Sequence, residues 1–337
     1  MDREKRKTGL SVIILLIIIL LVTATFSLLL GRFDISVREC FGIIFSKILP
    51  IEPFWTKVQN NMLMMVRLPR VVIAVLVGAS LSVAGTSYQC IFRNPMSAPD
   101  ILGASTGAAF GAALSILLQK SYMEITAWAF ISSMICVLLV LFVSRLCKGN
   151  QILNLILAGI MVGSLFSAGT SYIKLIADPN NTLPAITFWM MGSLSGADTA
   201  KMSYIWIPIL IGMVPIFVLR WKINILTLDD DEAKTMGVNT RLTRTIVIIS
   251  ATLLTAASVS VSGMIGWVGL VMPHVARKLV GDDCRILIPA AALVGGIFLV
   301  LTDDICRTLY TTEVPLGILT SLIGAPFFIY LMIKARE

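Results

Sequence analysis

The chain has 337 residues, of which 57% are hydrophobic and 14% charged, and its formal net charge is +8. Soluble domains carry about 25% charged residues, so this composition excludes an ordinary water-soluble enzyme and indicates an integral membrane protein. No G-x-x-x-x-G-K-[S/T] pattern occurs, which excludes a Walker-A nucleotide site in this sequence.

Apolar runs without Asp, Glu, Lys or Arg extend through most of the chain, and each can cross about 30 Å of hydrocarbon as a helix. Lipid offers no partners to backbone polar groups, and the alternation of barrel strands is absent, so we expect helices. In chain order the runs are Leu10–Leu30, Val71–Phe92, Ile101–Gln119, Ile125–Ser144, Gly149–Ile173, Met202–Leu219, Ile286–Thr302 and Val314–Ile333.

A ninth run, Thr245–Ala276, is too long for one crossing at about 1.5 Å per residue. Because Gly263, Gly266, Gly269 and Pro273 interrupt it, this run predicts one long span and one short span. The predicted fold class is therefore an all-α integral membrane protein with ten transmembrane helices. We expect residues 1–337 to form a single transmembrane domain.

Basic residues are distributed unevenly between the two ends of the predicted spans. Ten spans place both termini on one side, and with that side inside, most of the 27 Lys and Arg residues lie in inner loops or at the inner termini. The positive-inside rule therefore predicts that both termini are cytoplasmic. The first run is longer than the apolar region of a cleaved signal peptide, so we expect it to remain as a span. The charge of +8 reflects this distribution and does not indicate nucleic-acid binding.

Two outer segments and one short internal match add detail. Residues 31–66 are expected to hold a short interfacial helix, and Leu183–Met191, which is too short to cross, a re-entrant or surface helix. Ala79–Gly85 resembles Ala257–Gly263, in agreement with an inverted repeat of the kind found in transporters. Small residues that recur at helix contacts explain the match equally well.

The cysteines and the single histidine do not suggest chemistry. The six cysteines are scattered and form no C-x-x-C pair, so we expect neither a disulfide framework nor a metal site. His274 has no accompanying cluster of Cys, Asp or Glu in the membrane, which favours a structural role. No nucleophile–base pair is recognisable, so no catalytic residue is predicted.

Three stretches are more specific than the composition. They comprise Arg67-Leu68-Pro69-Arg70 with the turn Arg93-Asn94-Pro95-Met96, the segment from Gly266 to Arg277, and Asp303 to Arg307 with Glu313-Val314-Pro315-Leu316-Gly317 and Gly324-Ala325-Pro326. In this order, over nearly the whole chain, they closely resemble the FecCD/BtuC family. Its members are the permease subunits of type II ATP-binding-cassette (ABC) importers for ferric siderophores, haem and cobalamin.

The resemblance implies a BtuC-like permease fold in a bacterial or archaeal cytoplasmic (inner) membrane. It also implies a second permease copy, as a homodimer or a homologous heterodimer, two cytoplasmic ABC ATPase subunits that bind ATP and Mg²⁺, and an extracytoplasmic substrate-binding protein. The chain itself is then a transport subunit that binds no cofactor and is not an enzyme. The pathway is expected along the dimer axis, between the fifth and tenth spans of each copy.

The largest inner loop, residues 221–244, is expected to hold a short helix over Leu228–Met236, with Thr227 as its N-cap and Gly237 as its stop. By resemblance this is the coupling helix that fits a groove of the ATPase. The candidate coupling residues are Leu228, Asp229, Asp230, Asp231, Glu232, Ala233, Met236 and Gly237. The family usually has Gly where this chain has Asp229, and the alternative is an ordinary solvated loop helix.

Arg67, Arg70 and Arg307 fall at outer span ends, where the positive-inside rule gives no reason for cations. In the family, arginines at these positions receive carboxylates from the binding protein, which makes the three residues candidates for docking. The alternatives are anchoring at lipid headgroups and an i,i+4 pair between Asp303 and Arg307.

Two further positions are candidates for contact with the transport pathway. The resemblance places Asn94, Pro95 and Met96 beside a cytoplasmic gate, although ordinary turn chemistry also explains the prolines of this turn. Lys174 lies near the outer end of the fifth span, where an ionisable residue suggests contact with an anionic chelate. Snorkelling, or an i,i+4 pair with Asp178, is the alternative.

Ferric siderophore is the cargo that the resemblance favours, with cobalamin, haem and oxyanions as alternatives. An ion-driven secondary transporter is the alternative from another class. It would need intramembrane carboxylates for coupling, and the eight charge-free runs contain none. A membrane scaffold without transport activity fits poorly with the outer arginines and the capped inner helix.

Overall fold

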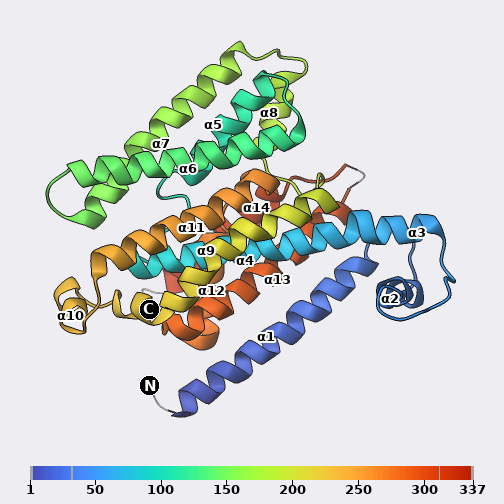
Figure 1. Cartoon of the computed structure of the whole chain (residues 1–337), viewed down its shortest axis with the longest axis horizontal. Coiled ribbons are helices and arrows are strands. Elements are labelled where there is room, and N and C mark those ends of the chain that lie inside the picture. Colours follow the sequence, from blue (N-terminus) through green and yellow to red (C-terminus); the bar gives the residue numbers. More distant parts are fainter. Residues whose placement is uncertain (1–2, 32, 311, 335–337) are drawn as a thin grey trace.

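Helices form the regular structure of the chain in the computed structural model, which describes residues 3–31, 33–310 and 312–334 (Figure 1). Within these ranges no strand occurs, as the all-α prediction requires. The helices are α1 (Arg3–Leu29), α2 (Val37–Phe45), α3 (Lys57–Asn61), α4 (Leu68–Phe92), α5 (Ala104–Leu117), α6 (Tyr122–Leu146), α7 (Gln151–Ile176), α8 (Thr182–Met190), α9 (Thr199–Ile225), α10 (Asp230–Thr235), α11 (Thr240–Ser262), α12 (Val268–Val280), α13 (Cys284–Thr308) and α14 (Leu316–Lys334), with a π-helical segment, Met62–Arg67, before α4.

Each of the ten predicted spans corresponds to one helix: α1, α4, α5, α6, α7, α9, α11, α12, α13 or α14. In the described part of the chain, seven helical segments are long and apolar enough to cross a membrane. The apolar helices α5 and α14 are shorter, and α12 has 13 residues. The all-helical membrane architecture is therefore confirmed, whereas the number of ten full crossings stays a prediction.

The predicted division of the ninth run is confirmed. Helix α11 ends at Ser262 and α12 begins at Val268. Between them Gly263 has φ 68° and Trp267 has φ 70°, both in the left-handed region. A right-handed helix cannot continue through such residues, so the chain bends here and α12 takes its own direction.

Helices α4 and α11 lie at the centre of the bundle. Buried residues make up 78% of the apolar window of α11, compared with 17% for α1. Helices α9 and α13 pack against α4, while α5, α6 and α7 form a layer on one side and α1 lies on the other (Figure 1). Figure 1 shows the start of α1 and α10 toward one end of the molecule, and α2 and α3 at the opposite end. Following the predicted orientation, we refer to these as the inner end and the outer end.

Close contacts between helices depend on small residues. A Cβ added to Gly78 of α4 would overlap the carbonyl oxygen of Gly295 on α13. One added to Gly107 of α5 would lie 2.6 Å from the Cβ of Cys136 on α6. In lipid, helices associate through such tight van der Waals packing, so these glycines set how closely the bundle packs.

At the inner end, α4 and α13 also meet through two cysteines. The Sγ atoms of Cys90 and Cys284 lie 2.7 Å apart, and both residues are buried, free cysteines. The sequence analysis treated the cysteines as scattered, because 194 positions separate these two in the chain. Only the packing of α4 against α13 brings them together.

The predicted outer helices are present. Residues 31–66 contain α2 and α3, each begun by a capping box, at Ser36 and at Thr56. Helix α8 covers most of the second predicted outer helix. The two matched segments lie in α4 and α11, but Gly85 is inside its helix and Gly263 ends its own, so the inverted repeat stays a prediction.

Candidate functional site

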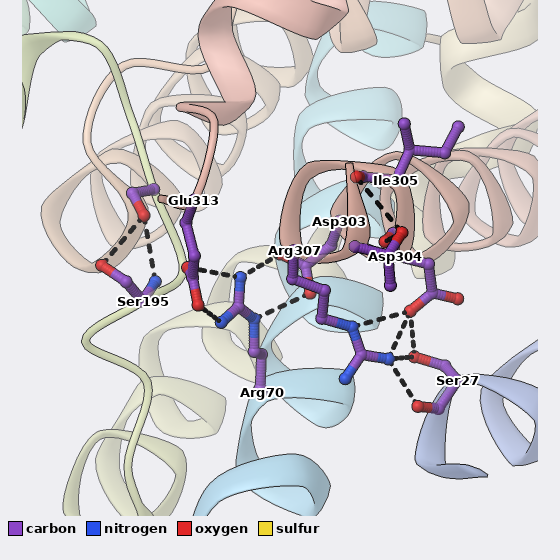
Figure 2. A network of polar contacts seen from close by, with 10 residues as sticks. Ser27, Arg70, Ser195, Asp303, Asp304, Ile305, Arg307 and Glu313 are labelled. Carbon is purple, nitrogen blue, oxygen red and sulfur yellow. Dashed lines mark hydrogen bonds and ion pairs between the residues drawn. The ribbon is translucent and has the colours of Figure 1, made fainter. Parts of the chain in front are cut away.

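Arg70 lies in the first turn of α4, between carboxylates from the end of α13 and from the loop after it (Figure 2). Its Nε and Nη2 donate to Asp303 at 2.8 and 2.9 Å, and its Nη1 and Nη2 donate to Glu313 at 2.8 and 2.9 Å. Arg70 is 7% exposed and Asp303 is 2% exposed. Two bidentate, charge-assisted contacts of this kind are strong and geometrically specific, so they join the outer ends of α4 and α13.

Arg307 and Arg67 are held in a similar way. The Nη2 of Arg307 donates to Asp304 Oδ1 at 2.5 Å and to the hydroxyl of Ser27 on α1 at 2.9 Å (Figure 2). The guanidinium of Arg67 donates to backbone carbonyls at and just beyond the end of α1. Arg67 is 3% exposed and Arg307 9%. Each arginine therefore fixes the outer end of α1 against the rest of the bundle.

Arg307 lies in the last turn of α13, as predicted, whereas Arg67 and Arg70 lie inside a continuous helical segment, Lys57–Phe92, that extends beyond the predicted span end. All three guanidinium groups are turned into the protein. Four of the five N–H donors of the Arg70 guanidinium are already bonded to Asp303 and Glu313, so a partner carboxylate could not form a bidentate contact without displacing one of them. The docking role thus stays a prediction. The alternative pair of Asp303 with Arg307 is wrong, because Arg307 pairs with Asp304 at i,i+3 while Asp303 binds Arg70.

The inner turn between α4 and α5 is rigid and tied to α12. Arg93 ends α4 in the left-handed conformation, with φ 51°. The side-chain oxygen of Asn94 accepts from the N–H of Met96 at 2.9 Å, and a ring N–H of His274 donates to the carbonyl of Pro95 at 2.9 Å. Met96 is 49% exposed. His274 thus has a structural contact on the turn, and the gate role of the turn stays a prediction.

Arg93 connects this turn to the segment before α10. Its Nη1 lies 2.6 Å from Asp229 Oδ1, and its Nε donates to the carbonyl of Leu226 at 3.2 Å. This ion pair joins residues 136 positions apart and was not predicted from the sequence. One hint of the pair was present in the sequence, because Asp229 stands at a position where members of the FecCD/BtuC family usually have Gly.

Helix α10 is shorter than predicted. It begins at Asp230, with Asp229 rather than Thr227 at the N-cap position. The hydroxyl of Thr227 donates to the carbonyl of Asn224 at 2.7 Å, and the carboxylate of Asp229 forms an ion pair with Arg93. Asp229 makes no side-chain hydrogen bond to the helix. The N–H of Leu228 bonds to the carbonyl of Ile225 at 3.0 Å, so the chain is still turning out of α9 at Leu228 and α10 starts after it.

The predicted stop at Gly237 is confirmed. Gly237 has φ 77°, and its N–H bonds to the carbonyl of Lys234 at 2.9 Å. The N–H of Val238 bonds to the carbonyl of Ala233 at 3.1 Å, which completes a Schellman motif. Ala233 and Val238 pack with Ile225 in a small apolar cluster that seats α10 against the bundle.

The other described residues of the predicted coupling segment face away from the bundle. Leu228 is 42% exposed and Met236 57%, and Asp231 and Glu232 are also exposed. The side chain of Asp230 lies outside the described residues. The inner end thus presents two apolar side chains next to acidic ones.

Lys174 lies in the last turn of α7 and is half-buried. The carboxylate of Asp178 accepts from the N–H of Asn181 at 2.9 Å and forms no ion pair with Lys174. The alternative of an i,i+4 pair between Lys174 and Asp178 is therefore wrong.

Lys174 continues a polar face of α7. Ser164, Ser167 and Ser171 stand at positions i, i+3 and i+7, all three are exposed, and Lys174 follows at i+10. At about 100° per residue these four side chains share one side of the helix. We refer to them as the α7 hydroxyl face. Figure 1 shows α7 at the edge of the bundle, and the spacing of these residues could have revealed the face from the sequence.

Comparisons with known proteins give consistent results. The family model described as "FecCD transport family" matches residues 17–334. The molybdate import system permease protein MolB of Haemophilus influenzae is 38% identical over 324 residues, which cover 96% of this chain and 95% of that protein. A Helicobacter pylori protein named "Probable iron chelatin transport system permease protein" is 40% identical over 271 residues, or 80% of this chain and 82% of that protein. A solved structure of an inward-facing metal-chelate type ABC transporter has a TM-score of 0.87 and 37% identity, covering 96% of this chain and 99% of that one.

Proposed function

Because the chain belongs to the FecCD transport family and is the permease component of an ABC importer, we propose that its cargo is a ferric siderophore. The chain is a multi-pass membrane protein, and the proposed transport runs from the outer end of the bundle to the inner end. The observation that carries the proposal is the α7 hydroxyl face.

Polar side chains on a membrane helix are expensive against lipid and therefore face protein or water. On the α7 hydroxyl face, Ser164 and Ser171 donate to carbonyls one turn earlier, at 2.7 and 2.9 Å, so each hydroxyl oxygen can still accept. Neutral hydroxyls suit a bulky chelate whose ligands enclose its metal, because they allow passage without tight binding. Lys174 at the outer end would attract an anionic chelate by its charge.

A second copy of the chain completes the proposed pathway. Only 28% of the apolar window of α7 is buried in one copy, so the helix has unused surface. We place the α7 hydroxyl face opposite the same face of a second permease copy, identical or homologous. The cargo would then pass between the two copies.

The proposed energy source is ATP hydrolysis on two partner ATPase subunits, which would bind ATP and Mg²⁺. The exposed side chains of Leu228 and Met236 would enter a groove of the partner, beside the acidic Asp231 and Glu232. The ion pair of Asp229 with Arg93 would transmit movement of α10 to the inner turn at Asn94, Pro95 and Met96. This arrangement requires α10 and both termini to be cytoplasmic.

A substrate-binding protein is proposed to dock at the outer end. Arg67, Arg70 and Arg307 would support that surface by fixing the ends of α1, α4 and α13. Arg70 and Arg307 already pair with internal carboxylates, whereas Arg67 binds backbone carbonyls. Of these carboxylates Glu313, whose side chain is 33% exposed, is the one that a carboxylate of the binding protein would most readily replace.

The test is uptake into proteoliposomes that hold the chain with its ATPase and a binding protein. Radiolabelled ferric siderophore, cobalamin, haem and molybdate are supplied in parallel, with and without ATP. We expect ATP-dependent uptake of the ferric siderophore. ATP-dependent uptake of a different cargo would contradict the cargo proposal, and uptake that follows an imposed proton or sodium gradient instead would contradict the proposed energy source.

Molybdate is the second candidate, favoured by the 38% identity to a molybdate permease over 96% of the chain. A small oxyanion carries its charge on its surface and would interact strongly with Lys174. Lys174→Ala should therefore reduce uptake of molybdate far more than uptake of a ferric siderophore with the same net charge.

A further inference from the structure

An apolar groove lies in a part of the bundle that includes no residue of α7. It has a volume of about 430 Å³ and is lined by apolar residues of α1, α12, α13 and α14, with Trp267 at the start of α12 among them. Leu301 and Ile323, on two of its walls, are 42% and 38% exposed. The groove is therefore open to its surroundings rather than enclosed in the core.

Hydrocarbon is the chemistry that suits this groove. Its lining contains no charged residue and no side chain with a hydroxyl or amide group. Water needs two to four polar partners to occupy a cavity, and this groove offers few. Because α1 and α13 are long and apolar enough to cross a membrane, we infer that the groove opens to lipid.

The inner end of the groove carries a positive charge. Val271, Val275 and Lys278 stand at i, i+4 and i+7 on α12, so Lys278 continues the face that lines the groove. Lys278 is exposed, and no carboxylate of the described residues pairs with it. The neighbouring Arg277 differs, because its guanidinium is engaged by Asp282 at 2.8 Å.

Helix α14 repeats this arrangement on the facing wall. Ile323, Phe327 and Tyr330 stand at i, i+4 and i+7, and Tyr330 is 53% exposed. The Lys278 Nζ lies 5.7 Å from the ring centroid of Tyr330. A lysine and a tyrosine thus stand together where the apolar walls end, and amphipathic side chains of this kind occupy membrane–water interfaces.

We propose that the groove binds one acyl chain of an anionic diacyl phospholipid of the inner leaflet, with the phosphate of the headgroup held by Lys278. Basic residues at the cytoplasmic ends of grooves between membrane helices bind anionic headgroups. The bound lipid fills the space between α1 and α14, which are otherwise joined through α12 and α13.

The first test places the lipid in the groove. A variant that keeps Trp267 and has phenylalanine at the other five tryptophans, Trp55, Trp128, Trp189, Trp206 and Trp221, is reconstituted as the assembled transporter. Phosphatidylglycerol or phosphatidylcholine, brominated on one acyl chain, is then titrated into unbrominated phosphatidylcholine. We expect phosphatidylglycerol to reach half-quenching of Trp267 fluorescence at a mole fraction about fivefold lower, as one basic residue near an anionic lipid would give.

Two outcomes of this titration would overturn the proposal. Equal half-quenching by the two lipids would show that the headgroup is not selected. Absence of quenching by either lipid in the assembled transporter would show that a second copy, or another protein, covers the groove.

The second test leaves all tryptophans in place and measures thermal unfolding of the detergent-purified transporter with added phosphatidylglycerol. Lys278→Ala should abolish most of the stabilisation by this lipid. Lys222→Ala is the matched control, because Lys222 lies over Trp221 at the same 5.7 Å but outside the groove. Equal loss in the two variants would indicate a general effect of surface charge and would contradict the proposal.

Discussion

At the scale of single residues, Arg70 shows how charge is stabilised in the outer part of the bundle. It shares its guanidinium between Asp303 on α13 and Glu313 on the following loop. Removing the guanidinium would leave Asp303, which is 2% exposed, as a buried charge without its partner. Breaking such a buried pair from one side is far more destabilising than breaking a surface pair.

We predict that Arg70→Ala lowers the free energy of unfolding by about 3 kcal/mol. Arg70→Lys should have an intermediate effect, because lysine keeps the charge but cannot make two bidentate contacts. The measurement is denaturant or thermal unfolding of the purified chain.

The control for this prediction is Lys120→Ala, which removes a pair with Glu124 at 3.6 Å whose side chains are 44% and 47% exposed. Its effect should stay below about 1 kcal/mol. Similar destabilisation by Arg70→Ala and Lys120→Ala would show that the outer network contributes little.

The sequence predicted in part where the site residues stand, but not their partners. Arg307 is at a helix end, as expected, but the helix that holds Arg67 and Arg70 starts earlier, at Lys57. The pairing of Arg70 with Asp303 joins positions 233 apart and depends on how α4 crosses α13. The i,i+4 spacing predicted a pair between Asp303 and Arg307. This prediction was wrong because Asp303 pairs with Arg70, which is distant in the sequence.

At the scale of elements, α10 and the inner turn are joined by the ion pair between Arg93 and Asp229. The pair is partly exposed, with side chains 29% and 80% accessible, so its effect on stability should be below about 1 kcal/mol. Its proposed role is to transmit motion, which depends on position more than on strength.

We predict that Asp229→Asn lowers the ratio of cargo uptake to ATP hydrolysis about fivefold, at the lower end of typical coupling energies. Exchanging the charges, with Arg93→Asp and Asp229→Arg together, should restore much of the ratio. The measurement is simultaneous uptake and phosphate release in proteoliposomes.

Asp231→Asn is the matched control for this variant. It removes the same charge from α10, but Asp231 pairs with Lys234 on its own helix at 3.0 Å and not with the inner turn. A comparable loss of coupling in Asp231→Asn would mean that the acidity of α10, and not the ion pair, matters.

The crossing of α4 and α13 gives another prediction at this scale. Gly78→Ala would place a Cβ against the backbone carbonyl of Gly295, which cannot move without separating the helices. Overpacking of this kind costs about 1–3 kcal/mol, so thermal unfolding should occur at lower temperature. Gly266→Ala, with nothing within 4 Å of its Cβ and an ordinary φ, should leave stability nearly unchanged. Equal stability of the two variants would refute the close crossing.

The hydrophobic runs predicted the helices well, because the length of a run and its lack of charged residues can both be read from consecutive positions of the sequence. The break of the ninth run was visible in Gly263 and Gly266, whereas Gly269 and Pro273 lie inside α12 and do not interrupt it. The start of α10 was not, since Thr227 satisfies the usual N-cap pattern and yet donates to Asn224. Tertiary contacts thus decided the ends of short helices that sequence patterns alone could not place.

At the scale of the whole molecule, the helices differ in how much of each is buried inside the bundle. The central helices α4 and α11 are largely buried, whereas α1, α7 and α9 have most of their surface exposed. Of the exposed helices, α7 carries three serines and a lysine on one side. We propose that this α7 hydroxyl face is the surface along which the cargo passes.

The most direct measurement is the reactivity of single cysteines on α7 with a charged, membrane-impermeant thiol reagent. The background is Cys147→Ser, because Cys147 is exposed and the other five cysteines are buried. Ser167→Cys and Ser171→Cys probe the hydroxyl face. Leu165→Cys is the control, since Leu165 is 72% exposed on a neighbouring apolar side of the same helix.

In the assembled transporter we expect Ser167→Cys and Ser171→Cys to react, and to be protected when cargo is delivered, while Leu165→Cys stays unreactive in lipid. Reaction of Leu165→Cys with both serine positions unreactive would place the water-filled pathway elsewhere and contradict the account.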